Sequence, residues 1–183
     1  HFFYTLPFKK NKALIETTWL SKINDDSLKD YDSQIKDYIS NRLGLKNYKV
    51  TYTEEGSIPL FYPQNIKEKN KIDIGTAGGM TRLSTGYTFL NIQTQSKYIR
   101  ENIESINNYK IFKIPKKYQF LDNIFLKVLE TNSQKMPNVF FKMFNTPAST
   151  VIKFLSNKSN FLEDLSIISK MPKWIFIKAI FGN

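Results

Sequence analysis

The sequence predicts a mixed α/β chain of the α+β kind, in which an antiparallel sheet region precedes a region of helices. Apolar and polar residues alternate within the first 20 residues, whereas beyond residue 117 apolar residues recur every three or four positions. These two periods are those of strands and helices. Four of the seven glycines fall within residues 75–86, between a predicted strand and a predicted helix.

The first predicted element is a β-hairpin. Residues 2–8 are rich in aromatic side chains, residues 9–12 form a polar turn, and residues 13–20 alternate. Alternation predicts two faces. One face carries Ala13, Ile15, Thr17 and Trp19, and the other carries Leu14, Glu16, Thr18 and Leu20.

The next elements are a helix and short strands. Apolar spacing predicts a helix over residues 31–43, with Gly44 at its left-handed C-terminal cap. Residues 48–52 predict a third strand, which continues through residues 55–60 into a turn or an edge strand, because Pro59 cannot donate to a ladder. Residues 72–74 predict a short strand that enters the glycine cluster.

A long helix is predicted from about residue 86 to residue 106. Its cap is Ser84 or Thr85. One side of this helix is expected to carry Tyr87, Leu90, Thr94 and Tyr98.

A basic connection over residues 108–117 leads to further helices. One carries its apolar stripe on residues 118–128, another begins with Thr146 and Pro147, a third with a capping box of Asn160 and Glu163, and the last follows Pro172. We therefore expect three regions. Residues 1–70 form a sheet region with one helix, residues 71–107 a closing strand, glycine loop and helix, and residues 108–183 a helical tail.

Composition restricts the chemistry. The chain has no Cys and a single His, at position 1, which excludes disulfides, thiolate nucleophiles and a multi-His zinc site within these residues. We expect no metal. Acid–base chemistry then falls to carboxylates, Tyr or Lys. No apolar run approaches the roughly 20 residues of a membrane span.

The positive charge is unevenly distributed. The net charge is +11, of which residues 108–183 contribute +8. This asymmetry predicts an anionic partner, either nucleic acid or a lipid surface, or else reflects a lysine-rich composition without a partner. Residues 108–183 contain no Arg, the residue that nucleic-acid readers usually employ, so nucleic acid is not expected. Aromatic residues alternate with lysines there, as on interfacial helices or, equally, on an ordinary bundle with its aromatics inward.

The glycine cluster has two interpretations. A strand, a glycine turn and a helix start allow a backbone to approach a phosphate or a flat ring closely. A tight structural turn has the same composition. The segment matches neither the GxGxxG fingerprint nor a Walker loop.

Residues 75–89, GTAGGMTRLSTGYTF, resemble the C-terminal flavin motif of bacterial lycopene cyclases. Three upstream segments match that family in the same order. They are residues 3–8 (FYTLPF), 14–18 (LIETT) and 55–59 (EGSIP). The resemblance implies the C-terminal part of a flavoprotein with an FAD/NAD(P)-binding Rossmann-type domain, an antiparallel substrate sheet and a C-terminal helical region. It also implies closure of the linear ψ-ends of lycopene into β-rings, assisted by reduced FAD without net redox change, with NAD(P)H as the reductant.

The resemblance assigns roles to specific residues. Glu16 matches the proposed acid–base carboxylate, and an apolar cavity around it would favour its protonated form. Glu54 and Glu55 match a supporting motif of the substrate sheet. The residues expected along the flavin are Gly75, Thr76, Gly78, Gly79, Ser84, Thr85 and Gly86.

The sequence departs from the family pattern at three positions. Thr17 stands where an acidic residue often follows the catalytic carboxylate, Thr76 where related flavoproteins have Asp, and Leu83 where many members have Pro. A pair of adjacent acids is therefore absent at position 16, and the loop is less rigid than a proline would make it.

Two alternatives remain open. A flavin-dependent isoprenoid reductase shares the scaffold but transfers hydride to the substrate. A basic peripheral module that binds membranes would have no catalysis. For the cyclase, we expect a linear carotenoid substrate and a cytoplasmic location, peripheral on the inner face of the membrane.

Overall fold

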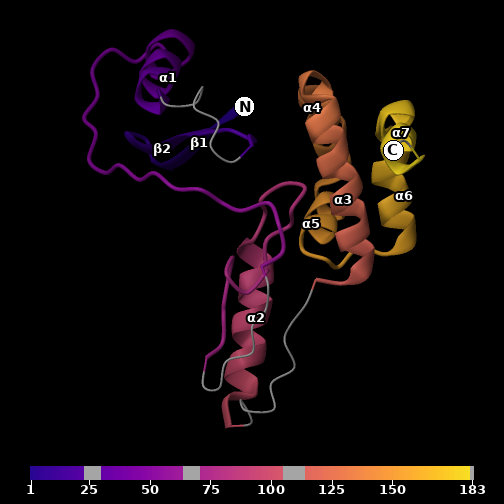
Figure 1. The fold of residues 1–183 in the computed structure, drawn as a ribbon. Coiled ribbons are helices and arrows are strands. Elements are labelled where there is room, and N and C mark those ends of the chain that lie inside the picture. Colours follow the sequence, from indigo (N-terminus) through magenta and orange to yellow (C-terminus); the bar gives the residue numbers. More distant parts are fainter. Residues whose placement is uncertain (23–29, 64–70, 105–113, 182–183) are drawn as a thin grey trace. The chain divides into compact units, whose positions relative to one another are not determined.

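The computed structural model describes residues 1–22, 30–63, 71–104 and 114–181 of the 183-residue chain. These residues form two compact units, His1–Glu55 and Gly56–Asn183, drawn in Figure 1. Each unit is described by itself.

The first unit is built on the predicted hairpin. Strand β1 (Phe2–Lys9) pairs antiparallel with β2 (Lys12–Thr18), in a register that places Tyr4 opposite Glu16 and Leu6 opposite Leu14. The register shifts between Pro7 and Lys9, beside a proline that has no N–H to donate. The hairpin and its lysine-rich turn are confirmed.

A helix covers one face of this hairpin. Helix α1 (Tyr31–Asp37) continues without a break into the π-helix η2 (Tyr38–Arg42). The Tyr38 ring stacks on Phe3 at 4.2 Å between centroids, and Gln34 Oε1 accepts bonds from Thr17 Oγ1 (3.2 Å) and Trp19 Nε1 (2.8 Å). The predicted face of Thr17 and Trp19 is therefore the one that the helix covers.

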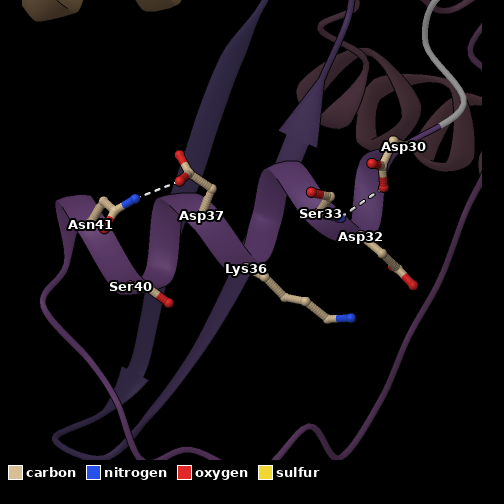
Figure 2. Close-up of a pocket in the computed structure, with 7 residues that line it drawn as sticks. All are labelled: Asp30, Asp32, Ser33, Lys36, Asp37, Ser40 and Asn41. Atoms are coloured by element: carbon tan, nitrogen blue, oxygen red, sulfur yellow. Dashed lines mark hydrogen bonds between the residues drawn. The ribbon is translucent and has the colours of Figure 1, made fainter.

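The ends of α1–η2 follow the sequence rules. Asp30 caps the start by accepting a bond from the Ser33 N–H, and Gly44 has the predicted left-handed φ of +67° beyond the end. Figure 2 shows the polar outer side of this helix, a shallow hollow that includes Lys36 and Asp37. None of the residues that the sequence assigned to chemistry lines this hollow.

Two predictions are wrong, those of the third strand and of the short strand before the glycines. Residues 48–60 and 71–74 form neither a helix nor a ladder in the described part of the chain. A strand needs a neighbouring backbone with which to exchange hydrogen bonds. For residues 71–74 a side chain substitutes, since Gln95 Nε2 donates to the Asp73 carbonyl over 3.3 Å.

The helix after the glycines is shorter than predicted. Helix α2 runs Phe89–Glu101 with Thr88 as N-cap, and residues 105–106 of the predicted range lie outside the described residues. Ser84 and Thr85 do not cap it, because Gly86 has a φ of +71° and the backbone turns back, with Arg82 N donating to the Tyr87 carbonyl over 2.9 Å. The buried side chains of α2 are Asn91 and Gln95, while the expected Leu90, Thr94 and Tyr98 are half-buried beside them.

The tail is helical, as predicted, although residues 108–113 of its basic connection lie outside the described residues. Its elements are α3 (Lys116–Thr131), η4 (Ser133–Lys135), α4 (Met136–Phe144), α5 (Ala148–Leu155), α6 (Phe161–Lys170) and α7 (Lys173–Phe181). In Figure 1 these helices lie together around α3.

Two apolar clusters hold the tail together, and α3 contributes to both. Tyr118 packs with side chains of α4, α5 and α6, whereas Phe125 and Val128 pack with α4 and α7. The predicted stripe on residues 118–128 is therefore the central surface of the tail. Phe140, Phe154 and Phe176 also face these clusters, whereas Phe141, Phe144, Trp174 and Phe181 are exposed.

One predicted cap is confirmed and one is wrong. Asn160 and Glu163 form the reciprocal capping box at the start of α6, each bond measuring 2.9 Å. Thr146 does not cap α5, because Pro147 is itself the N-cap residue and its backbone is extended (ψ 131°). The Thr146 hydroxyl is buried without a partner. In the described parts of the chain, no helix has the length and apolar character needed to cross a membrane.

Replacing Asn160 by Ala should lower the free energy of unfolding by about 1 kcal/mol, because the first turn of α6 loses its cap. Urea denaturation followed by circular dichroism measures this loss. The exposed Asn138 inside α4 serves as the control, since Asn138→Ala removes no cap and places a better helix former there. An equal loss in both variants would contradict the role of the capping box.

Candidate functional site

Glu16 lies at the middle of the hairpin face that α1 leaves uncovered. Across the ladder its partner is Tyr4, and the same face carries Leu6, Leu14 and Thr18. The Thr18 hydroxyl donates to Glu16 Oε1 over 2.8 Å, which fixes one carboxylate oxygen. The carboxylate thus stands among apolar and aromatic side chains, as the alternation predicted.

This face is open in the structure. Tyr4, Leu6 and Leu14 are 43%, 48% and 36% exposed, and Glu16 is exposed as well. Partial burial and the negative charge of Glu16 raise the pKa of Tyr4. The described residues of this unit do not form the expected apolar cavity, because one hairpin and one helix have only two layers and the helix occupies the opposite face.

Glu54 and Glu55 lie at the end of the same unit and are exposed. Glu54 Oε2 accepts a 2.7 Å hydrogen bond from the Tyr52 hydroxyl, which raises the pKa of that tyrosine. Within the described residues, no hydrogen bond or ion pair joins Glu16 to either carboxylate. The structure therefore does not bring the three acids together.

The glycine segment, residues 75–86, folds into consecutive tight turns whose N–H groups are largely satisfied internally. Gly78 N donates to the Ile74 carbonyl (3.1 Å), Gly79 N to that of Thr76 (3.0 Å) and Met80 N to that of Gly75 (3.0 Å). These N–H groups are thus not available to a phosphate. The interpretation as a structural turn describes residues 75–80 well.

Glycine is required here for steric reasons. A Cβ at Gly78 would lie 2.5 Å from the Asp73 carbonyl oxygen and 2.8 Å from Gln95 Nε2, both too close for any side chain. Gly75 and Gly79 have φ values of +59° and +74°, in the left-handed region. Gly78 therefore lets the segment approach α2, and Gly75 and Gly79 supply the left-handed residues of its turns.

Two polar side chains of α2 form hydrogen bonds to the glycine segment. Gln95 Oε1 accepts the Gly75 N–H over 2.8 Å, and Asn91 Nδ2 donates to the Met80 carbonyl over 3.1 Å. Asn91 Oδ1 in turn accepts a 3.0 Å bond from Asn157 Nδ2, beyond the end of α5. Asn91 and Gln95 are each only 2% exposed, so these bonds are made in a dry environment.

The second half of the segment differs. Ser84 is 4% exposed and its hydroxyl has no hydrogen-bond partner in the described chain. Gly86 has open space where a Cβ would stand, and the N-cap residue of α2, Thr88, makes no side-chain cap. A buried unpartnered hydroxyl and an uncapped helix start are the features of this segment that suit a polar ligand.

Between these two halves lies a buried ion pair that the sequence interpretation missed. Arg82 and Asp122 of α3 are both fully buried, and Arg82 donates through Nε (3.0 Å to Oδ2) and one terminal nitrogen (2.7 Å to Oδ1). Leu83 N also donates to Asp122 Oδ2, over 3.1 Å. The other terminal nitrogen of Arg82 donates to the Phe154 carbonyl.

The rings of Tyr118 and Phe154 complete this environment, lying 4.7 and 4.6 Å from the guanidinium carbon. Burial and the Asp122 charge raise the pKa of Tyr62 to about 12. The Tyr62 hydroxyl is close enough to Asp122 to respond to its charge but lacks hydrogen-bond geometry, and it is buried without a partner. The arrangement attaches the glycine segment to the tail.

The family model described as "Lycopene cyclase protein" matches residues 1–179. The match includes the hairpin, the glycine segment and the tail helices up to residue 179 in α7. The chain belongs to the lycopene cyclase family. Searches of curated proteins and of solved structures gave no match.

Membership of the lycopene cyclase family supports a carotenoid-cyclising type of enzyme and a carotenoid substrate.

The buried ion pair of Arg82, which sequence reasoning overlooked, had signals in the sequence. Arg82 is one of only three arginines, and Asp122 interrupts the apolar stripe of α3 between Tyr118 and Phe125. A charged residue on a buried stripe indicates a buried partner.

The geometry of Gly78 gives a matched pair of variants. Gly78→Ala should destabilise the second unit by about 3 kcal/mol or more, because the new methyl group meets backbone and cannot be relieved by a rotamer change. Gly56→Ala, where nothing lies within 4 Å and φ is not left-handed, should be neutral or slightly stabilising. Thermal melts of both variants test this, and equal melting temperatures would contradict the close packing.

Proposed function

We propose that this chain forms part of a lycopene cyclase that closes ψ-ends of a linear carotenoid into β-rings. The proposal depends on one observation, namely that Glu16 is an acid among mainly aromatic and aliphatic side chains, on the hairpin face that α1 leaves uncovered, in a chain of this family. The substrate has no polar group to bind, so an apolar surface with one proton donor matches its chemistry.

The reaction needs one proton to be added and one removed. Protonated Glu16 would give its proton to a terminal alkene carbon, and the resulting cation would be attacked by the neighbouring double bond, which closes the ring. Loss of a ring-carbon proton to a base then leaves a neutral ring alkene, and the other double bond of the end group has been converted into the new carbon–carbon bond of the ring. Atoms and electrons balance within the substrate, so the product has the mass of the substrate and the reaction is an isomerisation.

The environment of Glu16 suits both steps. A polyene laid over Tyr4, Leu6 and Leu14 would exclude water from the carboxyl, and desolvation favours its protonated form. After proton transfer the carboxylate and the face of the Tyr4 ring would both stabilise the positive charge. The Thr18 hydroxyl orients one oxygen, so the other is left for the substrate. Glu54 and Glu55 stay proposed as supporting residues of the substrate region.

The proposed cofactor is reduced FAD, with NAD(P)H as its reductant. When bound, reduced flavin would supply an electron-rich ring system able to stabilise a cation. The residues fit the group in part: Ser84 has an unpartnered buried hydroxyl, Gly86 leaves open space where a Cβ would stand, and the start of α2 has no side-chain cap. The N–H groups of Thr85 and Gly86 both donate to the Arg82 carbonyl, so we propose that these two residues shape the turn beside Ser84. Gly75, Thr76, Gly78 and Gly79 would instead shape the segment, because its N–H groups bond internally.

The variant Glu16→Gln keeps the shape of the side chain but removes the acid. We expect cyclisation by the intact protein to fall by about 10²–10⁴-fold, the usual contribution of a positioned acid. Asp32→Asn, an exposed acid in the same unit, is the control and should keep wild-type turnover. Mass spectrometry of the product adds a second readout. Wild-type turnover by Glu16→Gln would refute the assignment, and a product two hydrogens heavier would favour a reductase.

Ser84→Ala tests the cofactor contact. Because the hydroxyl is buried without a partner, its removal should leave the free energy of unfolding unchanged or slightly higher. FAD affinity, measured by quenching of flavin fluorescence, should fall by about two- to tenfold, which corresponds to one hydrogen bond. The exposed Ser149→Ala is the control. A loss of stability without a change in affinity would contradict the proposed contact.

A further inference from the structure

Helices α6 and α7 expose large apolar side chains on their outward faces. We call the following six residues the α6–α7 surface: Phe161, Leu162, Leu165, Trp174, Ile177 and Phe181. Four of them are 72%, 74%, 77% and 82% exposed, namely Phe161, Leu162, Trp174 and Phe181. On each helix they recur at helical spacing, so they form stripes rather than scattered exceptions.

These stripes are not unfilled core positions. Helix α7 already buries its inward face, since Ile175 is 8% exposed and packs with Phe125 and Val128 of α3. Helix α6 likewise directs Ile167 and Asp164 inward. A helix that is apolar on both faces but packed on only one needs a second apolar medium.

The charge around these stripes is of one sign. Residues 132–183 contain seven lysines and two acids, Glu163 and Asp164. Both acids are engaged, Glu163 with Lys153 and Asp164 with Lys117 at 2.7 Å. Lys173 and Lys178 lie exposed on α7 between its apolar residues. The surface is therefore apolar with cationic residues beside it.

We propose that the α6–α7 surface inserts into the headgroup region of an anionic lipid bilayer. Apolar stripes with lysines and a tryptophan are the composition of interfacial helices. Each helix has nine or ten residues, about 15 Å, half the thickness of a hydrocarbon core, so both would lie in the interface. The inference deepens the proposed function and rests on it in one respect. A polyene substrate dissolves in the bilayer, which gives the enzyme a reason to bind there.

Flotation of the intact protein with carotenoid-free vesicles tests the surface without requiring catalysis. Vesicles of phosphatidylglycerol and phosphatidylcholine in equal parts should bind the protein, and vesicles of phosphatidylcholine alone should bind it more weakly. In the double variant Trp174→Ser with Phe181→Ser, binding should fall by at least about tenfold for each ring lost. Tyr52→Ser, which removes a ring that is 69% exposed in the first unit, is the matched control and should bind normally.

The lysines form the second arm. Lys173→Glu with Lys178→Glu should weaken binding to the anionic vesicles by about fivefold or more for each residue, and added salt should weaken wild-type binding in the same direction. Lys10→Glu with Lys12→Glu, at the hairpin turn, imposes the same change of charge elsewhere and should have less effect. Hydrogen exchange of the vesicle-bound protein should show added protection in α6 and α7.

Three outcomes would overturn the proposal. They are absence of vesicle binding by the intact protein, equal loss in the Tyr52 control, or a dimer in solution that Trp174→Ser dissociates, because the surface would then be covered by a second copy. Unchanged melting temperatures in the variants exclude unfolding as the cause of lost binding. Vesicle binding without cyclisation would refute the proposed function alone, whereas cyclisation of detergent-dispersed carotenoid without vesicle binding would refute the surface alone.

Discussion

The second unit depends on the buried ion pair between Arg82 and Asp122. Removing two charges from water costs several kcal/mol for each ion, so the pair persists only because its remaining polar atoms are also bonded. The Leu83 N–H supplies one bond and the Phe154 carbonyl another, and the rings of Tyr118 and Phe154 lie near the guanidinium. Three segments that are distant in sequence therefore meet at one point: the middle of the glycine segment, α3 and the end of α5. Loss of either charge would leave the other buried without compensation.

Near this ion pair, side chains form hydrogen bonds of the kind that a neighbouring strand forms in a sheet. Gln95 accepts the Gly75 N–H and donates to the Asp73 carbonyl, as a neighbouring strand does. These hydrogen bonds explain why α2 buries two polar side chains, Asn91 and Gln95, although many apolar side chains of the protein are exposed. The consequence for function is a division within the segment. Residues 75–80 satisfy themselves and set the shape, whereas Ser84 and Gly86 retain the unpartnered hydroxyl and the open space through which we propose contact with the flavin.

Local patterns predicted most of the elements. The hairpin, the glycine end of η2, the capping box of α6 and the stripe of α3 all follow from residues that are close in sequence. The predictions that are wrong or missing concern partners that are distant in the sequence. Residues 48–52 alternate correctly, but no ladder forms in the described chain, because a strand is completed by another backbone and not by its own pattern. Arg82 bonds to a residue 40 positions away, which no spacing rule reveals. The position of Glu16 on its face was predicted, yet its exposure was not, since that depends on what covers the face.

Glu16 and the α6–α7 surface share one physical feature: each lies on a face with exposed apolar side chains that the described residues of its own unit leave uncovered. We assign the first to a carotenoid and the second to a bilayer, and the ion pair keeps the glycine segment fixed to the tail that carries that surface. A double-mutant cycle on the intact protein tests this attachment most directly, with unfolding free energies for Arg82→Met, Asp122→Leu and the pair together. Each single change should cost about 3–5 kcal/mol, and the double variant should recover much of that loss. Losses that add within about 0.5 kcal/mol would contradict the account.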